Sequence, residues 1–347
     1  MSLSGNVRTN SELELLVYGT RNLSQRGRPP GPFLDPTKGK SKSLLLLHFF
    51  LSCIMDTEQL SNLKRIVIQA MFRDDNLLER LVLKGGNALD IVHGLSERAS
   101  IDFDFSIEND FDPSEIQEIR DRLEAGIDAT FREHDLRIID FNFQEVPQPE
   151  QHHSSKLKFW GGYNITFKVV NSDSYSKYQG NIAALRNHAL AFGLSPTIKV
   201  EISKYEFCAK KEERDFDGYT IYVYSPAMLF AEKLRAICQQ LPAYRAIVDS
   251  GHRTGRARDF FDIYRIVEGL RVDVTDNETM ELIKVVFAAK QVPLQLLNHI
   301  GEMKELHEAD YPSLEQSVRN RSELKPLSYY FDYVDEICKK LEPLWKE

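Results

Sequence analysis

The chain has 347 residues, of which 42% are hydrophobic and 28% are charged, the balance of a globular protein that buries a sizeable core. Its formal net charge of −8 argues against a broad basic surface for non-specific nucleic-acid binding, so any contact with RNA should be local. The four cysteines lie far apart without a CxxC spacing, which implies neither a zinc site nor a disulfide framework and fits a reducing cytoplasm.

Residues 1–55 differ in composition from the rest of the chain. A basic stretch containing Pro29–Pro32 precedes the apolar run Leu44–Met55, which is shorter than the roughly 20 residues that span a bilayer but imitates a secretory signal. Three interpretations are open: a signal or anchor, an extension that packs on the fold, or an over-long gene prediction whose native start is Met55. We favour the last and expect no membrane contact, because the recognisable pattern begins directly after Met55.

Helical spacing begins at residue 57. Apolar residues recur at intervals of three and four from Leu60 to Met71, with Thr57 as a cap, and a shorter helix is expected over Asp75–Arg80. A brief strand, Leu81–Leu83, follows.

The next segment carries the strongest chemical signal. Successive side chains of a strand point to opposite faces, so Ser100, Asp102 and Asp104 share one face and the apolar residues between them share the other. Two carboxylates held side by side repel each other unless a cation lies between them, and Mg²⁺ prefers such oxygen ligands. We therefore predict a Mg²⁺ (or Mn²⁺) site at Asp102 and Asp104.

The turn Lys84-Gly85-Gly86 precedes a short helix predicted over Asn87–His93. Glycine lets the backbone approach a ligand closely, and a helix start offers free N–H groups to an anion. Metal-binding carboxylates beside a phosphate cradle are what nucleotidyl or phosphoryl transfer requires, because the metal bridges phosphate oxygens and lowers the charge on the transferring group.

The middle of the chain mixes helix and strands. Pro113–Glu133 is predicted as an amphipathic helix with Asp112 as its N-cap, followed by strands over Arg137–Val146 and Lys156–Val170.

The strand Ile198–Ser203 repeats the pattern of the first site. Lys199 and Glu201 alternate with Val200 and Ile202, so a polar face again carries an acid. The strand is either an exposed edge with mixed charges or the source of a further functional acid.

A strand over Tyr219–Tyr224 leads to Ser225 and Pro226, which predict the start of a helix that runs to about Gln240. Lys233 lies off the apolar stripe of this helix, where a lysine is usually solvated.

The segment after this helix gathers cations: Arg245, His252, Arg253, Arg256 and Arg258. Such a cluster is often a solvated face, but its place before the next helix makes it our candidate for holding triphosphate or RNA backbone. Arg258 and Asp262 have a spacing that allows an ion pair. Asp259 is interpreted either as a direct catalytic participant or as a partner, like Asp262, that fixes Lys233 by a salt bridge.

Five motifs in order, KGGNAL, RASIDFDFS, IKVEIS, FAEKLRA and RARDFFDIYRI, resemble the AbiEii/AbiGii-type nucleotidyltransferase toxins, a branch of the polymerase-β-like nucleotidyltransferase superfamily. The resemblance spans roughly Leu83 to Val267, and the ordered set is far more specific than a lone GG or DxD. It implies that Glu201 completes the metal site of Asp102 and Asp104 and that Lys233 and Asp259 act on the phosphates. The nucleotide-binding residues that it implies are Lys84, Gly85, Gly86, Ser100, Lys199 and Arg258.

The fold expected from the resemblance is α/β, with a mixed sheet of nucleotidyltransferase type flanked by helices. We expect an atypical extension (1–55), a catalytic domain (56–224) and a mostly helical C-terminal domain (225–347) that completes the active site. The last 75 residues are helical by their period but contain no motif.

The activity implied by the resemblance is transfer of a nucleoside monophosphate from an NTP to a hydroxyl acceptor, for this family the 3′ end of tRNA. Such a toxin would act in the cytoplasm and need a cognate antitoxin. Two alternatives stay open: an enzyme of this fold that modifies a small molecule or a protein, and a non-catalytic nucleotide- or RNA-binding relative. A neutral, narrow acceptor pocket would favour a small molecule over RNA.

Overall fold

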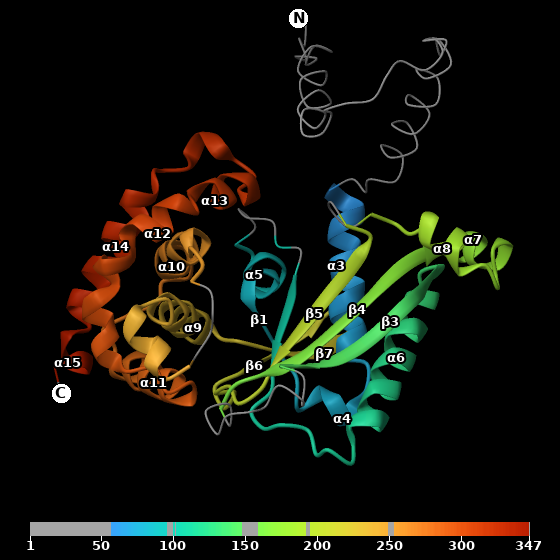
Figure 1. Cartoon of the computed structure of the whole chain (residues 1–347), viewed down its shortest axis with the longest axis horizontal. Helices are drawn as coiled ribbons and strands as arrows, with labels where there is room; N and C mark the ends of the chain where they lie inside the picture. Colours follow the sequence, from blue (N-terminus) through green and yellow to red (C-terminus); the bar gives the residue numbers. More distant parts are fainter. Residues whose placement is uncertain are drawn as a thin grey trace, which may run out of the picture. The chain divides into compact units, whose positions relative to one another are not determined.

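A mixed sheet of seven strands organises the part of the chain that this computed structural model describes, residues 57–95, 100, 102–147, 159–191, 195–248 and 253–346. The strands are β1 (Val82–Lys84), β2 (Phe103–Ser106), β3 (Leu136–Val146), β4 (Gly162–Asn171), β5 (Thr197–Ser203), β6 (Glu212–Phe216) and β7 (Tyr219–Val223). Their order across the sheet is β3-β4-β5-β2-β1-β7-β6 (Figure 1). The extension predicted for residues 1–55 lies outside the described residues.

Strands that are far apart in the sequence meet at the centre of the sheet. β2 pairs antiparallel with β1 and parallel with β5, and β1 pairs parallel with β7. In these registers Lys84 lies beside Asp104, and Asp104 lies beside Glu201. Residues opposite each other in paired strands point to the same face, so these three charged side chains share one face of the sheet. The α/β class with a mixed sheet, predicted from the sequence, is confirmed.

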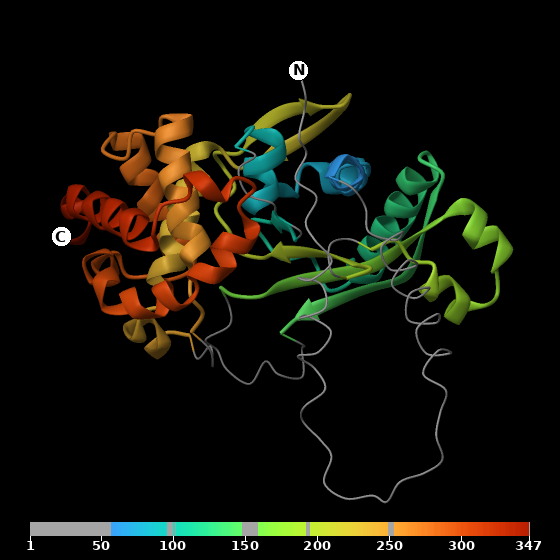
Figure 2. The ribbon, with the colours of Figure 1, turned by 90° about the horizontal axis from the view of Figure 1, so that it is seen from above.

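The other face of the sheet packs against α3 (Thr57–Met71) and α6 (Ile116–Arg132), which lie on the same side of it in Figure 2. Phe103 and Phe105 of β2 are fully buried. The ring centroid of Phe105 lies 5.7 Å from that of Phe72, which directly follows α3. The predicted alternation of β2 is therefore correct: its aromatic residues enter the core and its acids take the opposite face.

The start of α6 differs from the prediction. The helix begins at Ile116 rather than at Pro113, and Glu115 is its N-cap. Asp112 is not the cap, because its carboxylate instead accepts from the backbone N–H and the hydroxyl of Ser114, at 2.8 and 2.6 Å. These bonds stabilise a turn that delays the helix by three residues.

The chain after β7 forms helices that pack on one another, coloured yellow-brown to red in Figure 1. They are α9 (Pro226–Cys238), η4 (Pro242–Ala246), α10 (Ala257–Leu270), α11 (Asn277–Ala289), η5 (Leu294–Met303), α12 (Lys304–Ala309), α13 (Tyr311–Ser317), η6 (Arg321–Glu323), α14 (Leu327–Lys340) and α15 (Glu342–Trp345). The predicted start of α9 is confirmed, since the Ser225 hydroxyl accepts from the Met228 N–H at 3.3 Å and Pro226 opens the helix.

Some elements carry no clear signal in the sequence. These are the short helices α7 (Ser172–Lys177) and α8 (Ile182–Asn187) and the charged strand β6, whereas the short helix predicted over Asp75–Arg80 is present as α4 (Asp75–Leu78) and ends two residues early. Within the last 75 residues, which their period predicts as helical, residues 294–309 are divided between the 3₁₀ segment η5 and the α-helix α12.

The predicted domain boundary at residues 224 and 225 coincides with the junction of β7 and α9, and it stays a prediction. Among the described helices, none has the length and apolar character needed to cross a membrane. The three cysteines of the described part, Cys208, Cys238 and Cys338, are buried free thiols.

Candidate active site

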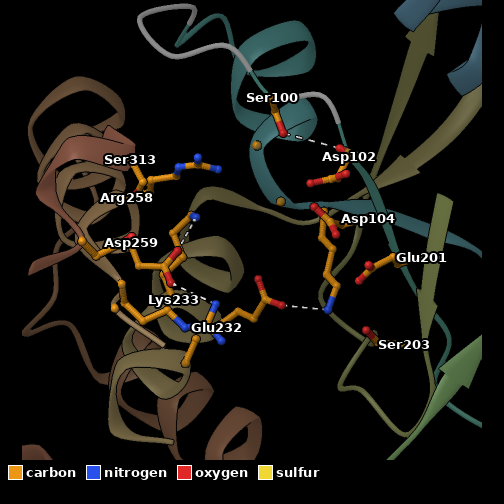
Figure 3. Close-up of a pocket in the computed structure, with 17 residues that line it drawn as sticks. Ser100, Asp102, Asp104, Glu201, Ser203, Glu232, Lys233, Arg258, Asp259 and Ser313 are labelled. Carbon is orange, nitrogen blue, oxygen red and sulfur yellow. Dashed lines mark hydrogen bonds and ion pairs between the residues drawn. The ribbon is translucent and has the colours of Figure 1, made fainter. Parts of the chain in front are cut away.

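A cavity of about 520 Å³ lies between the polar face of the sheet and the helices α9 and α10 (Figure 3). From the sheet and the loops next to it come Lys84, Gly85, Gly86, Ser100, Asp102, Asp104, Glu201 and Ser203. From the helical part come Glu232, Lys233, Ala236, Gly255, Arg256, Arg258, Asp259, Asp310 and Ser313.

Ten of the eleven residues singled out in the sequence line this one cavity. Lys199 is the exception. It shares a face with Glu201, as predicted, but its ammonium group forms a very short ion pair with the Glu201 carboxylate and does not line the cavity. The structure thus brings together residues from motifs that are up to 175 positions apart, while their individual roles stay predictions.

Asp102 and Asp104, before and within β2, are held differently. Asp104 lies in the sheet between Lys84 and Glu201. Asp102 is exposed and precedes the strand, and its backbone carbonyl accepts from the side-chain amide of the fully buried Asn87 at 2.7 Å. Both carboxylates point into the cavity (Figure 3).

Asp104 has an unusual protonation equilibrium. Burial raises the pKa of its carboxyl to about 6, the charge of Lys84 works against this rise, and the nearby carboxylates of Glu201, Glu232 and Asp102 add to it. When burial and like charges raise the pKa of a carboxyl group, a bound cation would stabilise the ionised form of that group.

The glycine turn approaches Asp104 closely. Gly85 has φ +70°, and a Cβ atom at this position would lie 2.2 Å from Oδ2 of Asp104. Gly85 opens α5 (Gly85–Asn87), which continues as the π-helical turn η1 (Ala88–Val92), so the helix predicted over 87–93 begins two residues early. Both the backbone angle and the contact require glycine here.

Lys84 does not extend freely into the cavity. Its side chain is buried, and its Nζ lies 2.7 Å from Oε1 of Glu232 and 3.5 Å from Oε1 of Glu206. Burial alone would lower its pKa, but these two carboxylates outweigh burial and raise the pKa above its usual value. Lys84 therefore ties the sheet to α9 beneath the cavity.

Lys233 is held between two acids of α10. Its Nζ lies 3.0 Å from Oδ1 of Asp259 and 2.7 Å from Oδ2 of Asp262. The salt bridge considered from the sequence is therefore present, and it involves both aspartates. Lys233 and Asp262 are buried, although a lysine off the apolar stripe of a helix is usually solvated.

The two arginines before and within α10 differ in how they are held. Arg256 reaches Asp259 with an Nη1–Oδ2 distance of 3.7 Å. Arg258 is exposed at the cavity edge, and no described residue pairs with its guanidinium, while the Asp262 carboxylate that its spacing suggested as a partner engages Lys233. Arg258 is thus a cation available to a ligand.

The segment around α12 and α13 closes the cavity against the start of α10. Oδ2 of Asp310 accepts from the Ala257 N–H at 3.1 Å, and Nδ1 of His307 accepts from the Arg256 N–H at 3.1 Å. Burial lowers the pKa of His307 to about 4, which keeps the ring neutral and able to accept. Gly255 is required here, because its Cβ would lie 2.1 Å from Cβ of Asp310.

Several cavity residues escaped sequence analysis. Glu232 stands beside Lys233 in the FAEKLRA motif, and an acid within so apolar a helix was a usable signal. Asp310 and Ser313 come from the region without a motif, so the sequence offered no signal for them.

The cavity has an excess of acid, with six carboxylates and four cationic side chains in its lining. Three of those carboxylates, Asp102, Asp104 and Glu201, form the oxygen donor set that suits a hard divalent cation. Within the described residues, however, no three acidic, histidine or cysteine side chains are placed as a formed metal site. The donor chemistry fits a cation, whereas Glu201 is engaged by Lys199.

A family model described as "Nucleotidyl transferase AbiEii toxin, Type IV TA system" matches residues 69–334. No curated protein matches the chain in a sequence search.

Solved structures give distant similarities. A candidate nucleotidyltransferase from Helicobacter pylori aligns with a TM-score of 0.42 and 14% identity over 84% of this chain and 98% of its own. MenT4, a nucleotidyltransferase toxin from Mycobacterium tuberculosis, aligns with a TM-score of 0.39 and 14% identity over 82% of this chain and 83% of its own. A nucleotidyltransferase-like protein from Paracoccidioides brasiliensis aligns with a TM-score of 0.35 and 14% identity over 74% of this chain and 94% of its own. These similarities are too distant to transfer the role of any residue.

Proposed function

Because the chain belongs to the AbiEii nucleotidyltransferase toxin family of type IV toxin–antitoxin systems, we propose that it transfers a nucleoside monophosphate from an NTP to a hydroxyl group of RNA. The acceptor that we propose is the 3′ end of tRNA, with pyrophosphate as the second product. The observation that supports this most is the placing of Asp104 and Glu201, in one register row, in a cavity whose far wall holds Lys233 and Arg258.

The charge of the cavity supports a requirement for a divalent cation. A lining with more acids than cations repels a triphosphate unless another positive charge is present. Asp102, Asp104 and Glu201 are the residues that would hold Mg²⁺ or Mn²⁺. A bound cation would neutralise negative charge on the phosphate oxygens and would make the acceptor hydroxyl easier to deprotonate.

The remaining residues of the site would bind and orient the nucleotide. The Gly85-Gly86 turn and Ser100 line the cavity, where their backbone and hydroxyl groups would reach phosphate oxygens. Arg258 would contact the terminal phosphates, and Lys233, fixed by Asp259 and Asp262, would present a charge of constant position. On this proposal Asp259 acts through Lys233.

Blocking the 3′ end of tRNA would stop translation, so the proposal includes a cognate antitoxin and action in the cytoplasm, where NTPs and tRNA are present. The toxin–antitoxin family supports the existence of an antitoxin.

The test is an incubation of the full chain with Mg²⁺, each α-labelled NTP in turn and total tRNA, with Asp102→Ala and an EDTA-treated sample as controls. Label in RNA that depends on both Asp102 and the metal is the expected result, and it identifies the nucleotide. Equal labelling by Asp102→Ala, or no label in RNA with any NTP, would contradict the proposal.

Transfer to a small molecule is the second candidate function. A neighbouring cavity of about 320 Å³ beside Glu201 has four cationic and three acidic side chains in its lining, so it is nearly neutral and small. Label found in a low-molecular-weight product rather than in RNA would favour this candidate.

A further inference from the structure

A second cavity of about 320 Å³ adjoins the first. The two share the residues Lys84, Glu201, Ser203, Glu232, Ala236 and Arg256, which lie on the border between them. We propose that this second cavity, the acceptor chamber, holds the terminal nucleoside of the RNA acceptor with its base stacked on Trp160. This inference rests on the proposed function and names the place where its second substrate binds.

The position of Glu201 separates the two cavities. Across the sheet, Glu201 of β5 lies between Asp104 of β2 and Asn164 of β4. Both cavities reach β5, but only the first includes the aspartates next to and within β2, and only the acceptor chamber extends to Asn164 and Gly162 of β4. A hydroxyl group entering from the chamber would therefore meet Glu201 before it reaches the aspartates.

The chemistry of transfer places the acceptor on this side. The attacking oxygen and the leaving pyrophosphate lie roughly in line on opposite sides of the phosphorus. In Figure 3, Arg258 lies at the opposite end of the first cavity from Glu201 and Ser203. If Arg258 binds the terminal phosphates, the attacking hydroxyl must come from the end at Glu201, where the acceptor chamber begins.

The cations beneath the chamber are engaged by a buried carboxylate of the protein. The carboxylate of buried Glu206 accepts from Nη1 and Nη2 of Arg235 at 2.8 and 3.2 Å, and its Oε1 lies 3.5 Å from Nζ of both Lys84 and Lys290. These cations are therefore not available to several phosphates of an RNA backbone. The chamber instead suits the uncharged parts of a nucleotide, the base and the ribose.

Trp160 supplies an apolar surface at the chamber. Its side chain is 37% exposed, which is unusual for so large an apolar group among the described residues. Stacking on an aromatic ring binds any base, because every base has a flat π face. Asn164 is half-buried in the chamber lining, and its amide has no hydrogen-bond partner within the described part of the chain, so it is available to the edge of a stacked base.

The backbone next to Trp160 is fixed by its neighbours. A Cβ on Gly162 would lie 2.1 Å from the carbonyl oxygen of Ile202, and Gly161 has φ +119° with the place of its Cβ 3.0 Å from the carbonyl oxygen of Val146. Gly162 is also in register with Ser203. Trp160 is therefore presented by backbone that is packed against β3 and β5, which reduces the loss of entropy on binding.

The test compares Trp160→Ala and Trp160→Phe with the full wild-type chain. We expect Trp160→Ala to raise the KM for RNA about tenfold or more, because stacking is lost, and Trp160→Phe to stay near wild type. The KM for NTP should change by less than about twofold in both. Tyr329→Ala is the matched control, since Tyr329 is 46% exposed on α14 and lines neither cavity.

The outcomes separate this inference from the proposed function. An unchanged KM for RNA in Trp160→Ala, with wild type still labelling RNA, overturns the acceptor chamber and leaves RNA transfer standing. If the wild type labels no RNA, the proposal of transfer to RNA fails, and the acceptor chamber is then tested by measuring the binding of a labelled single-stranded RNA through its fluorescence anisotropy. Weaker binding by Trp160→Ala with wild-type binding by Trp160→Phe supports the chamber. Wild-type binding by both variants overturns it.

Discussion

The two walls of the candidate active-site cavity differ in what fixes their charged side chains. On the sheet wall, Lys84, Asp104 and Glu201 stand in one row because the backbones of β1, β2 and β5 are paired in register. On the helical wall, Lys233 is fixed by ion pairs to the side chains of Asp259 and Asp262. Removing the charge of Asp104 or Glu201 from the sheet wall should therefore change chemistry without changing the fold, whereas removing the charge of Lys233 from the helical wall should affect both.

The substitution Asp104→Asn should give the largest loss of activity. The amide keeps the size of the side chain but removes a charge that a cation needs, and we expect transfer to fall about 1000-fold or more. The free energy of unfolding at pH 7 should be unchanged or higher, because burial disfavours the Asp104 charge. Label transfer and urea denaturation measure the two effects.

Asp121→Asn is the matched control, since Asp121 is an exposed aspartate of α6 outside the cavity. An Asp104→Asn enzyme that keeps wild-type activity would show that the sheet wall holds no required cation ligand.

The sheet wall could be predicted from sequence because its pattern is local. Alternation along a strand assigns Asp102, Asp104 and Glu201 to polar faces without any knowledge of the neighbouring strands. The same alternation was not sufficient for Lys199, which does not line the cavity. Lys199 lies on the predicted face of β5, but two residues before Glu201 and opposite Thr166, and its side chain pairs with Glu201. Where a cavity ends depends on tertiary packing, which the alternation of side chains along a strand does not encode.

Gly85→Ala tests whether the sheet wall depends on backbone approach. A methyl group at Gly85 meets Oδ2 of Asp104, so the carboxylate must shift, and we expect about a 100-fold loss of activity. Gly218→Ala is the matched control: Gly218 also has a positive φ, of +82°, but nothing lies within 4 Å of its Cβ position. Both variants should lose about 1 kcal/mol of stability from backbone strain, and only Gly85→Ala should lose activity.

Equal activity of the two alanine variants would show that the close approach of Gly85 to Asp104 has no catalytic consequence. Melting curves of both variants check that the strain is comparable.

Lys233→Met tests the helical wall. It removes the cation that lies 3.0 Å from Asp259 and 2.7 Å from the buried Asp262, and we expect a loss of about 3–5 kcal/mol in stability. We also expect roughly a 30-fold loss of activity at a temperature where the variant is folded. The double variant Lys233→Met/Asp262→Asn should recover part of the stability, because the buried charge that faced Lys233 is removed, but none of the activity.

Recovery of activity in the double variant would mean that Lys233 only balances charge. Unchanged stability in the single variant would contradict the contrast between the two walls.

The helical wall was less predictable from sequence because side chains from distant segments fix it. α9 is buried around most of its circumference, so its period did not show that Glu232 would face Lys84, which is 148 positions away. Asp310 reaches the cavity through its bond to the Ala257 N–H, a contact between segments 53 positions apart. Capping of α9 by Ser225 was predictable because it depends on neighbours in sequence alone.

Arg258→Gln should have the smallest effect and sharpens the comparison within the helical wall. Arg258 has no partner among the described residues, so its loss should leave the free energy of unfolding unchanged, unlike that of Lys233. Losing one charged hydrogen bond to phosphate should raise the KM for NTP about tenfold, with kcat nearly unchanged. Arg321→Gln, at an exposed arginine of η6 outside the cavity, is the matched control for a lost surface charge. If Arg258→Gln and Arg321→Gln have the same KM for NTP, Arg258 does not bind the phosphates. If Arg258→Gln lowers the free energy of unfolding, Arg258 is a structural residue like Lys233.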